Sequence, residues 1–288
     1  MEIFRTVVNC PSSPEKIDYQ TALTMLGSCF AENLGLRMEQ LKFNISLNPF
    51  GIVYHPAPIA HSIERIISAK PYTVDDLEHH DGYWSSFDHH GKFSRSEAPA
   101  CLEIINNTLQ EAHNQLACSQ WLFVSFGTAW AYRLKSTGKT VANCHKFLAS
   151  HFERIRFQVD EIYDIWEKTI SALRKFNPAI KIVFTISPIR HLRDGAHENQ
   201  LSKSTLLLAV ERLINEQEGI TYFPAYEIVL DELRDYRFYD ADMTHISPVA
   251  INYIWRRFCE TYIADSAFPI MKKVEAEVKA AAHRKLKN

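Results

Sequence analysis

Two short segments near opposite ends of the chain carry side chains that could together form a catalytic triad. Ser28 and Cys29 follow Gly27 at the end of a short apolar run, and the residues after them are apolar at helical spacing. Asp242 and His245 lie three residues apart, just before an apolar helical stretch. In a turn, this spacing lets the aspartate carboxylate reach Nδ1 of the histidine and leaves Nε2 available to take a proton. The pattern predicts Ser28 as nucleophile, His245 as general base and Asp242 as the acid that orients it.

Each of these residues also has an alternative role. Serine is a favoured helix N-cap, so Ser28 could serve only to begin the helix that follows it. Asp242 could likewise cap a helix, with His245 packed beside Tyr239. Cys29 is a second candidate nucleophile, because a thiolate at a helix N-terminus is activated and Cys–His–Asp catalysis is chemically sound. Adjacent residues in a sharp turn point in different directions, so only one of Ser28 and Cys29 can face His245.

Alternating strand-like and helical segments predict the scaffold that positions these residues. The strand-like segments are continuous apolar runs, which suit a sheet covered on both faces. Their alternation with helices favours a mainly parallel five-stranded sheet in a three-layer α/β/α sandwich. Ligands bind at the carboxyl ends of such strands, where Gly27 and Ser28 fall. The expected strands are 22–26, 44–47, 121–126, 180–186 and 220–223, and the expected helices include 59–68, 101–117, 159–176 and 202–216.

We expect one α/β domain over residues 1–264, followed by a C-terminal helix over 265–288 whose simplest role is that of a solvated helix. Residues 71–98 are polar and aromatic, and they are predicted to form a long excursion over the surface that could wall a site. Adjacent histidines in a polar loop rarely converge on one ion, so we predict no metal site there. The excursion's histidines and aspartates are His79, His80, Asp81, Asp88, His89 and His90.

Composition excludes several classes of protein. The 288 residues are 46% hydrophobic, enough for a substantial core, and the formal net charge of −2 gives no electrostatic footprint for nucleic acid. No apolar run approaches the roughly 20 residues that span a membrane, and the first residues lack a secretory signal, so we expect a cytoplasmic protein. The six cysteines are scattered without a CxxC pair, which favours neither a zinc site nor a disulfide scaffold.

The sequence resembles the GSCFA family, which takes its name from five residues found here at 27–31 and is related to the SGNH, or GDSL-type, esterases. The motifs that carry the resemblance extend over nearly the whole chain. They include NPFGIVYHP (48–56), SFGTAW (125–130), NCHK (143–146), SPIRH (187–191), ENQLSKS (198–204) and DELRDYRFY (231–239). The resemblance implies an SGNH-type, flavodoxin-like fold. It also implies a serine esterase with Ser28, His245 and Asp242 as its triad, and an oxyanion hole made by the amides of Ser28 and Gly51.

The third sequence block departs from the SGNH pattern. These enzymes usually carry GxND after the third strand, with the asparagine side chain as an oxyanion donor. Here the same places hold Gly127, Thr128, Ala129 and Trp130. Losing one such donor costs on the order of a hundredfold to a thousandfold in rate. Thr128, Asn48 and Asn143 are candidates to replace it.

Several further residues could line the substrate pocket, and they are Asn48, Gly127, His145, Arg190 and His191. The resemblance favours Ser28 over Cys29 as nucleophile, so we expect Cys29 to point into the layer between sheet and helix as a small packing residue. The predicted reaction is hydrolysis of an acyl ester, such as an acetyl ester, on a small molecule or carbohydrate, with no cofactor. An acyltransferase would use the same acyl-enzyme. A non-catalytic glycan-binding protein is the alternative from another class.

Overall fold

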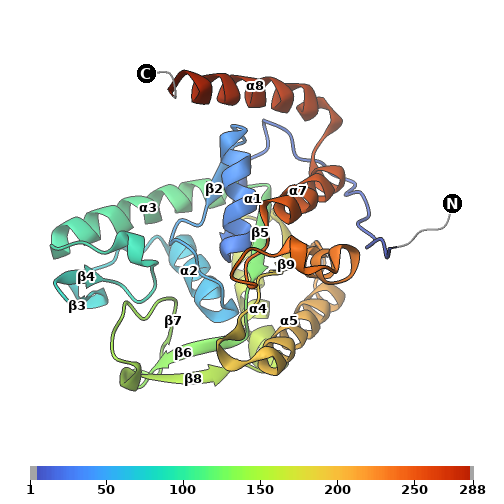
Figure 1. The fold of residues 1–288 in the computed structure, drawn as a ribbon. Coiled ribbons are helices and arrows are strands. Elements are labelled where there is room, and N and C mark those ends of the chain that lie inside the picture. The colour runs from blue at the N-terminus through green and yellow to red at the C-terminus, as the bar shows by residue number, and fades with distance from the viewer. Residues whose placement is uncertain (1–4, 286–288) are drawn as a thin grey trace.

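The computed structural model describes residues 5–285, and a five-stranded parallel sheet forms its centre (Figure 1). Each predicted strand is present within one or two residues of its expected bounds. The strands are β1 (Leu23–Gly27), β2 (Ile45–Leu47), β5 (Trp121–Phe126), β9 (Lys181–Ile186) and β10 (Ile220–Tyr222). All neighbouring pairs in this sheet are parallel, so the sequence-based expectation is confirmed.

The order of the strands locates the position in this sheet where a ligand is expected to bind. Across the sheet the order is β2-β1-β5-β9-β10, which in sequence terms is the flavodoxin-like order 2-1-3-4-5. The direction of winding reverses between β1 and β5, and ligands of such sheets bind at this switch point, beyond the carboxyl ends of the strands. In the register of these two strands, Gly27 lies opposite Ser125. The candidate site therefore begins at Gly27.

Helices cover both faces of the sheet, which confirms the three-layer α/β/α sandwich. Along β5, Leu122, Val124 and Phe126 belong to one hydrophobic cluster, while Trp121 and Phe123 belong to another, as the alternation of side chains along a strand requires. The first cluster is covered by α2 (Pro56–Ser68), α3 (Ala98–Cys118), α4 (Val159–Phe176) and α5 (Ala196–Glu216). The second is covered by α1 (Cys29–Gln40) and α7 (Pro248–Tyr262), with the short α6 (Ala225–Glu227) beside them.

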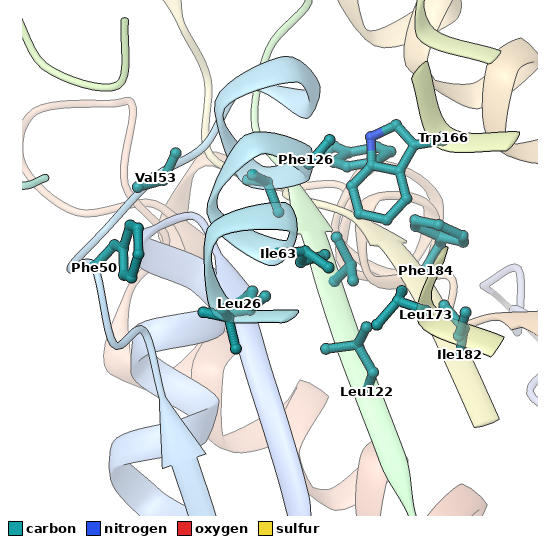
Figure 2. Close-up of a cluster of buried hydrophobic side chains, with 14 of the residues drawn as sticks. Leu26, Phe50, Val53, Ile63, Leu122, Phe126, Trp166, Leu173, Ile182 and Phe184 are labelled. Carbon is teal, nitrogen blue, oxygen red and sulfur yellow. The ribbon is translucent and has the colours of Figure 1, made fainter. Parts of the chain in front are cut away.

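Aromatic packing fixes α4 on its face of the sheet (Figure 2). The Trp166 ring centroid lies 5.1 Å from that of Phe126 and 4.9 Å from that of Phe184, both edge-on. Its indole N–H donates to the Pro56 carbonyl at the start of α2, over 3.2 Å. A buried aromatic side chain of this size contributes about 3–5 kcal/mol, judged by truncation to alanine. The α2 and α4 helices are thus held together over the carboxyl half of β5 and β9.

The excursion at 71–98 is more ordered than the sequence suggested, and a second small sheet was not predicted. A hairpin of β3 (Glu78–His80) and β4 (Tyr83–Ser85) lies within the excursion. An antiparallel sheet in the order β7-β6-β8 follows β5, built from β6 (Trp130–Leu134), β7 (Thr140–Val141) and β8 (Phe152–Arg156). These strands are short and their pairings are local, so they leave little hydrophobic periodicity in the sequence.

The C-terminal helix expected from residue 265 is present as α8 (Phe268–Lys285). Its residue Met271 is buried in the hydrophobic cluster of α1 and α7, and Glu277 pairs with Lys42 at 3.2 Å. Figure 1 shows α8, in red, lying beyond α1 and α7, on the side of the molecule away from β6 and β8. Among residues 5–285, no helix is long and apolar enough to cross a membrane.

Candidate active site

A glycine that no other residue could replace without strain joins β1 to α1. Gly27 has a φ of +135°, and a Cβ placed on it would lie 2.2 Å from the carbonyl oxygen of Ser125. Its amide donates to Oδ1 of Asn48 over 2.8 Å, which ties the end of β1 to the segment after β2. The glycine thus permits the close approach of β1 and β5 that forms the turn carrying Ser28 and Cys29.

Ser28 is the N-cap of α1, which was one of its two predicted roles. Its Oγ accepts from the amide of Phe30 at 3.2 Å and lies 2.9 Å from Oγ of Ser125. The Ser28 amide donates to the Ser125 carbonyl over 3.2 Å, and only 2% of the residue is exposed. The role of Ser28 as a nucleophile stays a prediction, and it requires the hydroxyl to leave both of these partners.

Cys29 differs from its expected placement as a residue that only packs between sheet and helix. It is half-buried and contacts the cluster beneath α1, but it also lines a cavity of about 410 Å³. The volume is in the range of small-molecule sites. Burial raises the pKa of the Cys29 thiol, and its own backbone amide acts in the opposite direction. The cavity is also lined by Tyr54, His90, Trp130, Tyr132, Asn143 and Cys144.

The hydrogen bond predicted between Asp242 and His245 is present. Oδ2 of Asp242 lies 2.6 Å from Nδ1 of His245, and Oδ1 accepts from the amides of Thr244 and His245, each at 2.9 Å. The hydrogen bond from His245, followed by those from the two amides, holds the pKa of Asp242 well below its usual range. The side chains of both residues are about half exposed, at 49% and 50%. Nε2 of His245 has no partner among the described residues, so it is available to a reacting group.

Arg190 holds the segment that carries this pair. Its guanidinium donates to the carbonyl of Met243 and its amide to that of Thr244, each over 3.0 Å. The guanidinium also lies over the ring of Tyr239, 5.5 Å from its centroid. These contacts connect the segment after β9 to the segment before α7. These contacts give Arg190 a positioning role, and its contact with a substrate stays a prediction.

His191 follows β9 and packs beside Tyr54. Its ring centroid is 5.4 Å from that of Tyr54, and Tyr54 lines the cavity with Cys29. Burial lowers the pKa of His191 to about 3, and the positive charge of His245 is one of the smaller contributions in the same direction. His191 is therefore neutral at neutral pH, and His245 is near enough to contribute to the lowering of its pKa.

The predicted oxyanion donors are mostly engaged in bonds of their own. The Gly51 amide donates to the Asn48 carbonyl over 2.7 Å. Asn48 itself is buried and donates from Nδ2 to Glu32 over 2.6 Å. Oγ1 of Thr128 pairs with Oγ of Ser202 at 2.9 Å and is buried as well.

Asn143 is the remaining candidate for the missing asparagine, and it lines the cavity with Cys29. Its Oδ1 accepts from the amide of His145 over 2.8 Å, while its Nδ2 has no acceptor in the part of the chain that the structure describes. The ring of His145 pairs through Nε2 with the Ser86 carbonyl at 2.8 Å, which supports the loop. Gly127 donates its amide to the Tyr54 carbonyl over 2.7 Å, and a Cβ there would lie 3.1 Å from Nε2 of His191. Gly127 thus permits a close approach at the edge of the site.

The family model of the GSCFA family matches residues 22–258, which is most of the chain and includes both halves of the site. The protein belongs to the GSCFA family. No protein of curated function matches it significantly.

Known structures with a similar arrangement are carbohydrate esterases. A carbohydrate esterase family 3 protein from Talaromyces cellulolyticus is 9% identical with a TM-score of 0.40, covering 90% of this chain and 99% of its own. A family two carbohydrate esterase from Clostridium thermocellum is 10% identical with a TM-score of 0.39, and the match covers 84% of this chain and 63% of the esterase. A carbohydrate esterase family 2 enzyme from Corynascus thermopiles is 10% identical with a TM-score of 0.40, and the match covers 94% of this chain and 68% of the enzyme. Likenesses this distant carry no argument about activity.

Sequence reasoning missed one buried cation beneath the site of this GSCFA protein. Lys203, on α5, is 1% exposed, and its Nζ donates to the carbonyls of Gly127 and Ser187 over 2.5 and 2.6 Å. These carbonyls follow β5 and β9, so the lysine connects the ends of two central strands. Burial lowers the pKa of Lys203 to about 7. The available signal was the helical spacing of Lys203, within the ENQLSKS motif, with Leu206 and Val210 on the apolar face of the stretch.

The histidines of the excursion have separate environments in the structure. His89 is buried against Phe50, with ring centroids 4.3 Å apart, whereas His80 stacks on Phe147 at 4.2 Å. His61 and Lys139 pair with Asp88, at 3.0 and 2.8 Å. Within residues 5–285, no three His, Cys, Asp or Glu side chains are grouped so that they could hold a metal ion.

Proposed function

We propose that the protein hydrolyses an acyl ester through a covalent acyl-enzyme, with His245 as general base and Asp242 as the residue that orients it. One observation carries the proposal. The carboxylate of Asp242 lies 2.6 Å from Nδ1 of His245, which leaves Nε2 of a half-exposed imidazole without a partner in the described chain. This arrangement fixes the tautomer that can accept a proton from a nucleophile. The switch point of the sheet and the cavity beside it support the same place for a substrate.

The reaction proceeds in two steps. A nucleophile on the turn after β1 attacks the ester carbonyl, and its proton passes to Nε2 of His245. The bond to the alcohol then breaks as His245 gives that proton to the departing oxygen. Water attacks the acyl-enzyme with His245 taking its proton, and the acid leaves while the nucleophile is protonated again. Ser28 is the nucleophile that the resemblance implies, in a triad with His245 and Asp242.

The N-terminus of α1 is the proposed place for the oxyanion of the tetrahedral intermediate. Backbone N–H groups and the helix dipole favour negative charge at such a position. Asn143 is the proposed side-chain donor to this oxyanion, in place of the asparagine that the third block lacks. Its Nδ2 group has no acceptor among the described residues. The predicted Gly51 donor takes part only if its amide leaves the Asn48 carbonyl.

The proposed substrate is an acylated carbohydrate or another small ester. The cavity presents Tyr54, Trp130 and Tyr132 together with a few polar groups, a lining typical of sites for small organic ligands. No cofactor enters any step of this reaction. Transfer of the acyl group to an acceptor differs from hydrolysis only in the second step, where a hydroxyl of the acceptor attacks the acyl-enzyme in place of water.

Hydrolysis of 4-nitrophenyl acetate and labelling by a fluorophosphonate probe test the proposal. We expect turnover in the wild type and a loss of roughly a hundredfold to ten-thousandfold in His245→Ala. His197→Ala is the matched control, because His197 is an exposed histidine on α5. Equal rates in the wild type and His245→Ala would contradict the proposal. Binding of a glycan without turnover or labelling, in folded protein, would favour the non-catalytic alternative.

A further inference from the structure

We propose that the nucleophile of this site is the thiol of Cys29 and that Ser28 is the helix cap that holds the thiol in place. The inference rests on the proposed acyl-transfer function and concerns which of two adjacent side chains performs it. Three features of the turn carry it, and each distinguishes the two residues.

The first feature is the hydrogen bonding of Ser28. Its Oγ accepts from the Phe30 amide at 3.2 Å and pairs with Oγ of Ser125 at 2.9 Å, so the hydroxyl has a partner as cap and a second partner on β5. Its amide is also paired, with the Ser125 carbonyl at 3.2 Å. A nucleophile in this position would have to break the cap of α1 in each turnover. The serine is built into the turn, and it does not line the cavity that Cys29 lines.

The second feature is the exposure of Cys29 to the cavity. Cys29 is the first residue of α1, a helix of 12 residues, and its side chain borders the cavity of about 410 Å³. Its amide has no acceptor among residues 5–285. An attacking thiol and an unpaired amide on the same residue provide both a nucleophile and a donor for the oxyanion that forms. The positive end of the helix dipole favours negative charge on the sulfur of Cys29 and on the oxyanion of the substrate.

The third feature is the polar lining of the cavity that Cys29 borders. Asn143 lines this cavity, and its Nδ2 has no acceptor among the described residues. Buried and half-buried polar groups are usually hydrogen-bonded, so this group can serve a ligand in the cavity. Cys29 borders this space, whereas Ser28 does not line it.

The position of His245 is compatible with a proton transfer from this thiol. Cys29 packs against the hydrophobic cluster that contains Ile246, the residue next to His245. His245 also influences the charge of His191, whose ring contacts Tyr54 on the cavity wall. His245 does not itself line the cavity that Cys29 borders, so the proposal requires its imidazole to reach Sγ of Cys29 in the substrate complex.

The chemistry balances with this thiol as nucleophile. Sγ of Cys29 attacks the ester carbonyl and forms an S–C bond, the thiol proton goes to Nε2 of His245, and the C–O bond to the alcohol breaks with return of that proton to its oxygen. Water then attacks the thioester, its proton is taken by His245, and the C–S bond breaks. The acid leaves and the thiol is protonated again. Because burial keeps the resting group a neutral thiol, the base is needed in the first step.

Trapping of the acyl-enzyme identifies the nucleophile. The protein is mixed with 4-nitrophenyl acetate, quenched in acid and analysed by intact mass and peptide mapping, with and without neutral hydroxylamine. We expect one acetyl group on Cys29 that hydroxylamine removes, since it cleaves thioesters far faster than oxygen esters. Cys29→Ala should form no adduct and lose at least about a hundredfold in turnover, whereas Ser28→Ala should retain turnover within about tenfold.

Cys118→Ser is the matched control, because Cys118 is an exposed cysteine at the end of α3 and does not line the cavity. It should leave both adduct and turnover unchanged. An adduct on Ser28 that resists hydroxylamine would overturn the inference while the proposed function stands. If no residue is acetylated and no variant changes turnover, the proposed function fails with it. Hydroxylamine-sensitive labelling of Cys29 that persists in Cys118→Ser and is slowed in His245→Ala supports both.

Discussion

Oγ of Ser28 lies 2.9 Å from Oγ of Ser125, and this pair joins the turn after β1 to the carboxyl end of β5. The two strands are neighbours on either side of the switch point, and Gly27 pairs with Ser125 in their register. The Ser28 hydroxyl also caps α1 through the Phe30 amide. One side chain therefore sets both the direction in which α1 begins and the position of Cys29, its first residue.

Removal of this hydroxyl should destabilise the fold measurably. Loss of a serine N-cap costs about 0.5–2 kcal/mol, and Ser28→Ala also leaves the buried Ser125 hydroxyl without this partner. We therefore expect the free energy of unfolding in urea to fall by about 1–2 kcal/mol. Ser171→Ala, on the exposed side of α4, is the control and should stay within about 0.5 kcal/mol of the wild type. An unchanged urea midpoint for Ser28→Ala would show that the cap contributes little.

The scaffold could be predicted from the sequence because its signals are local and regular. The run WLFVSF became β5 with the predicted bounds, and the amphipathic stretch at 159–176 became α4 without a shift. The hairpin within 71–98 and the sheet of β6, β7 and β8 were missed, because their strands are two to five residues long and pair only with one another.

The candidate site, like the fold, could be predicted only where its contacts are local in the sequence. The bond between Asp242 and His245 could be predicted because it spans three residues and needs only a turn. Which of Ser28 and Cys29 enters the cavity depends on Ser125, nearly a hundred residues away, and no local pattern contains that contact. The engagement of Gly51 and Asn48 in other bonds is likewise a property of the folded turn.

Lys203 should be needed for the stability of the fold. In Lys203→Met the buried carbonyls of Gly127 and Ser187 lose their donor, and each unpaired buried group costs about 1–3 kcal/mol. We expect a loss of about 2–4 kcal/mol in the free energy of unfolding, measured by urea denaturation at pH 7. Lys175→Met, at an exposed position on α4, is the control and should have little effect. Equal stability of the two variants would mean that water replaces the ammonium group without cost.

Asp88 should make the fold sensitive to acid. It is 5% exposed and accepts from His61, Lys139 and Tyr72, at 3.0, 2.8 and 3.2 Å. Burial alone would raise the pKa of Asp88, but the hydrogen bond from His61 and the charges of His61 and Lys139 outweigh it and hold the pKa well below its usual range. The folded pKa lies below the unfolded value of about 3.9, so the ionised carboxylate stabilises the fold above that pH. This contribution is lost as the pH falls from about 4 toward the folded pKa.

Urea denaturation of the wild type and Asp88→Asn between pH 3 and pH 7 measures this contribution. The wild type should lose stability below about pH 4 more steeply than the variant, because the amide that replaces the carboxylate does not titrate in that range. The variant should be the less stable protein at pH 7, where the carboxylate of the wild type is paired with His61 and Lys139. Parallel curves for the two proteins would show that Asp88 does not contribute to acid unfolding.

Asp242 should be required for turnover but should not limit the reaction at mildly acidic pH. Because the hydrogen bonds from His245 and two amides hold its pKa well below the usual range, the carboxylate stays ionised at pH values where a free aspartate is half protonated, near 3.9. We expect no inflection from this group in the pH profile of kcat/KM above about pH 4. Asp242→Asn should lower kcat by about a hundredfold or more, since the amide can stabilise neither the required tautomer nor the imidazolium. Asp240→Asn, two residues away, is the matched control and should retain activity. A full rate in Asp242→Asn would mean that the carboxylate only shapes the turn, and His245 would then act without an orienting acid.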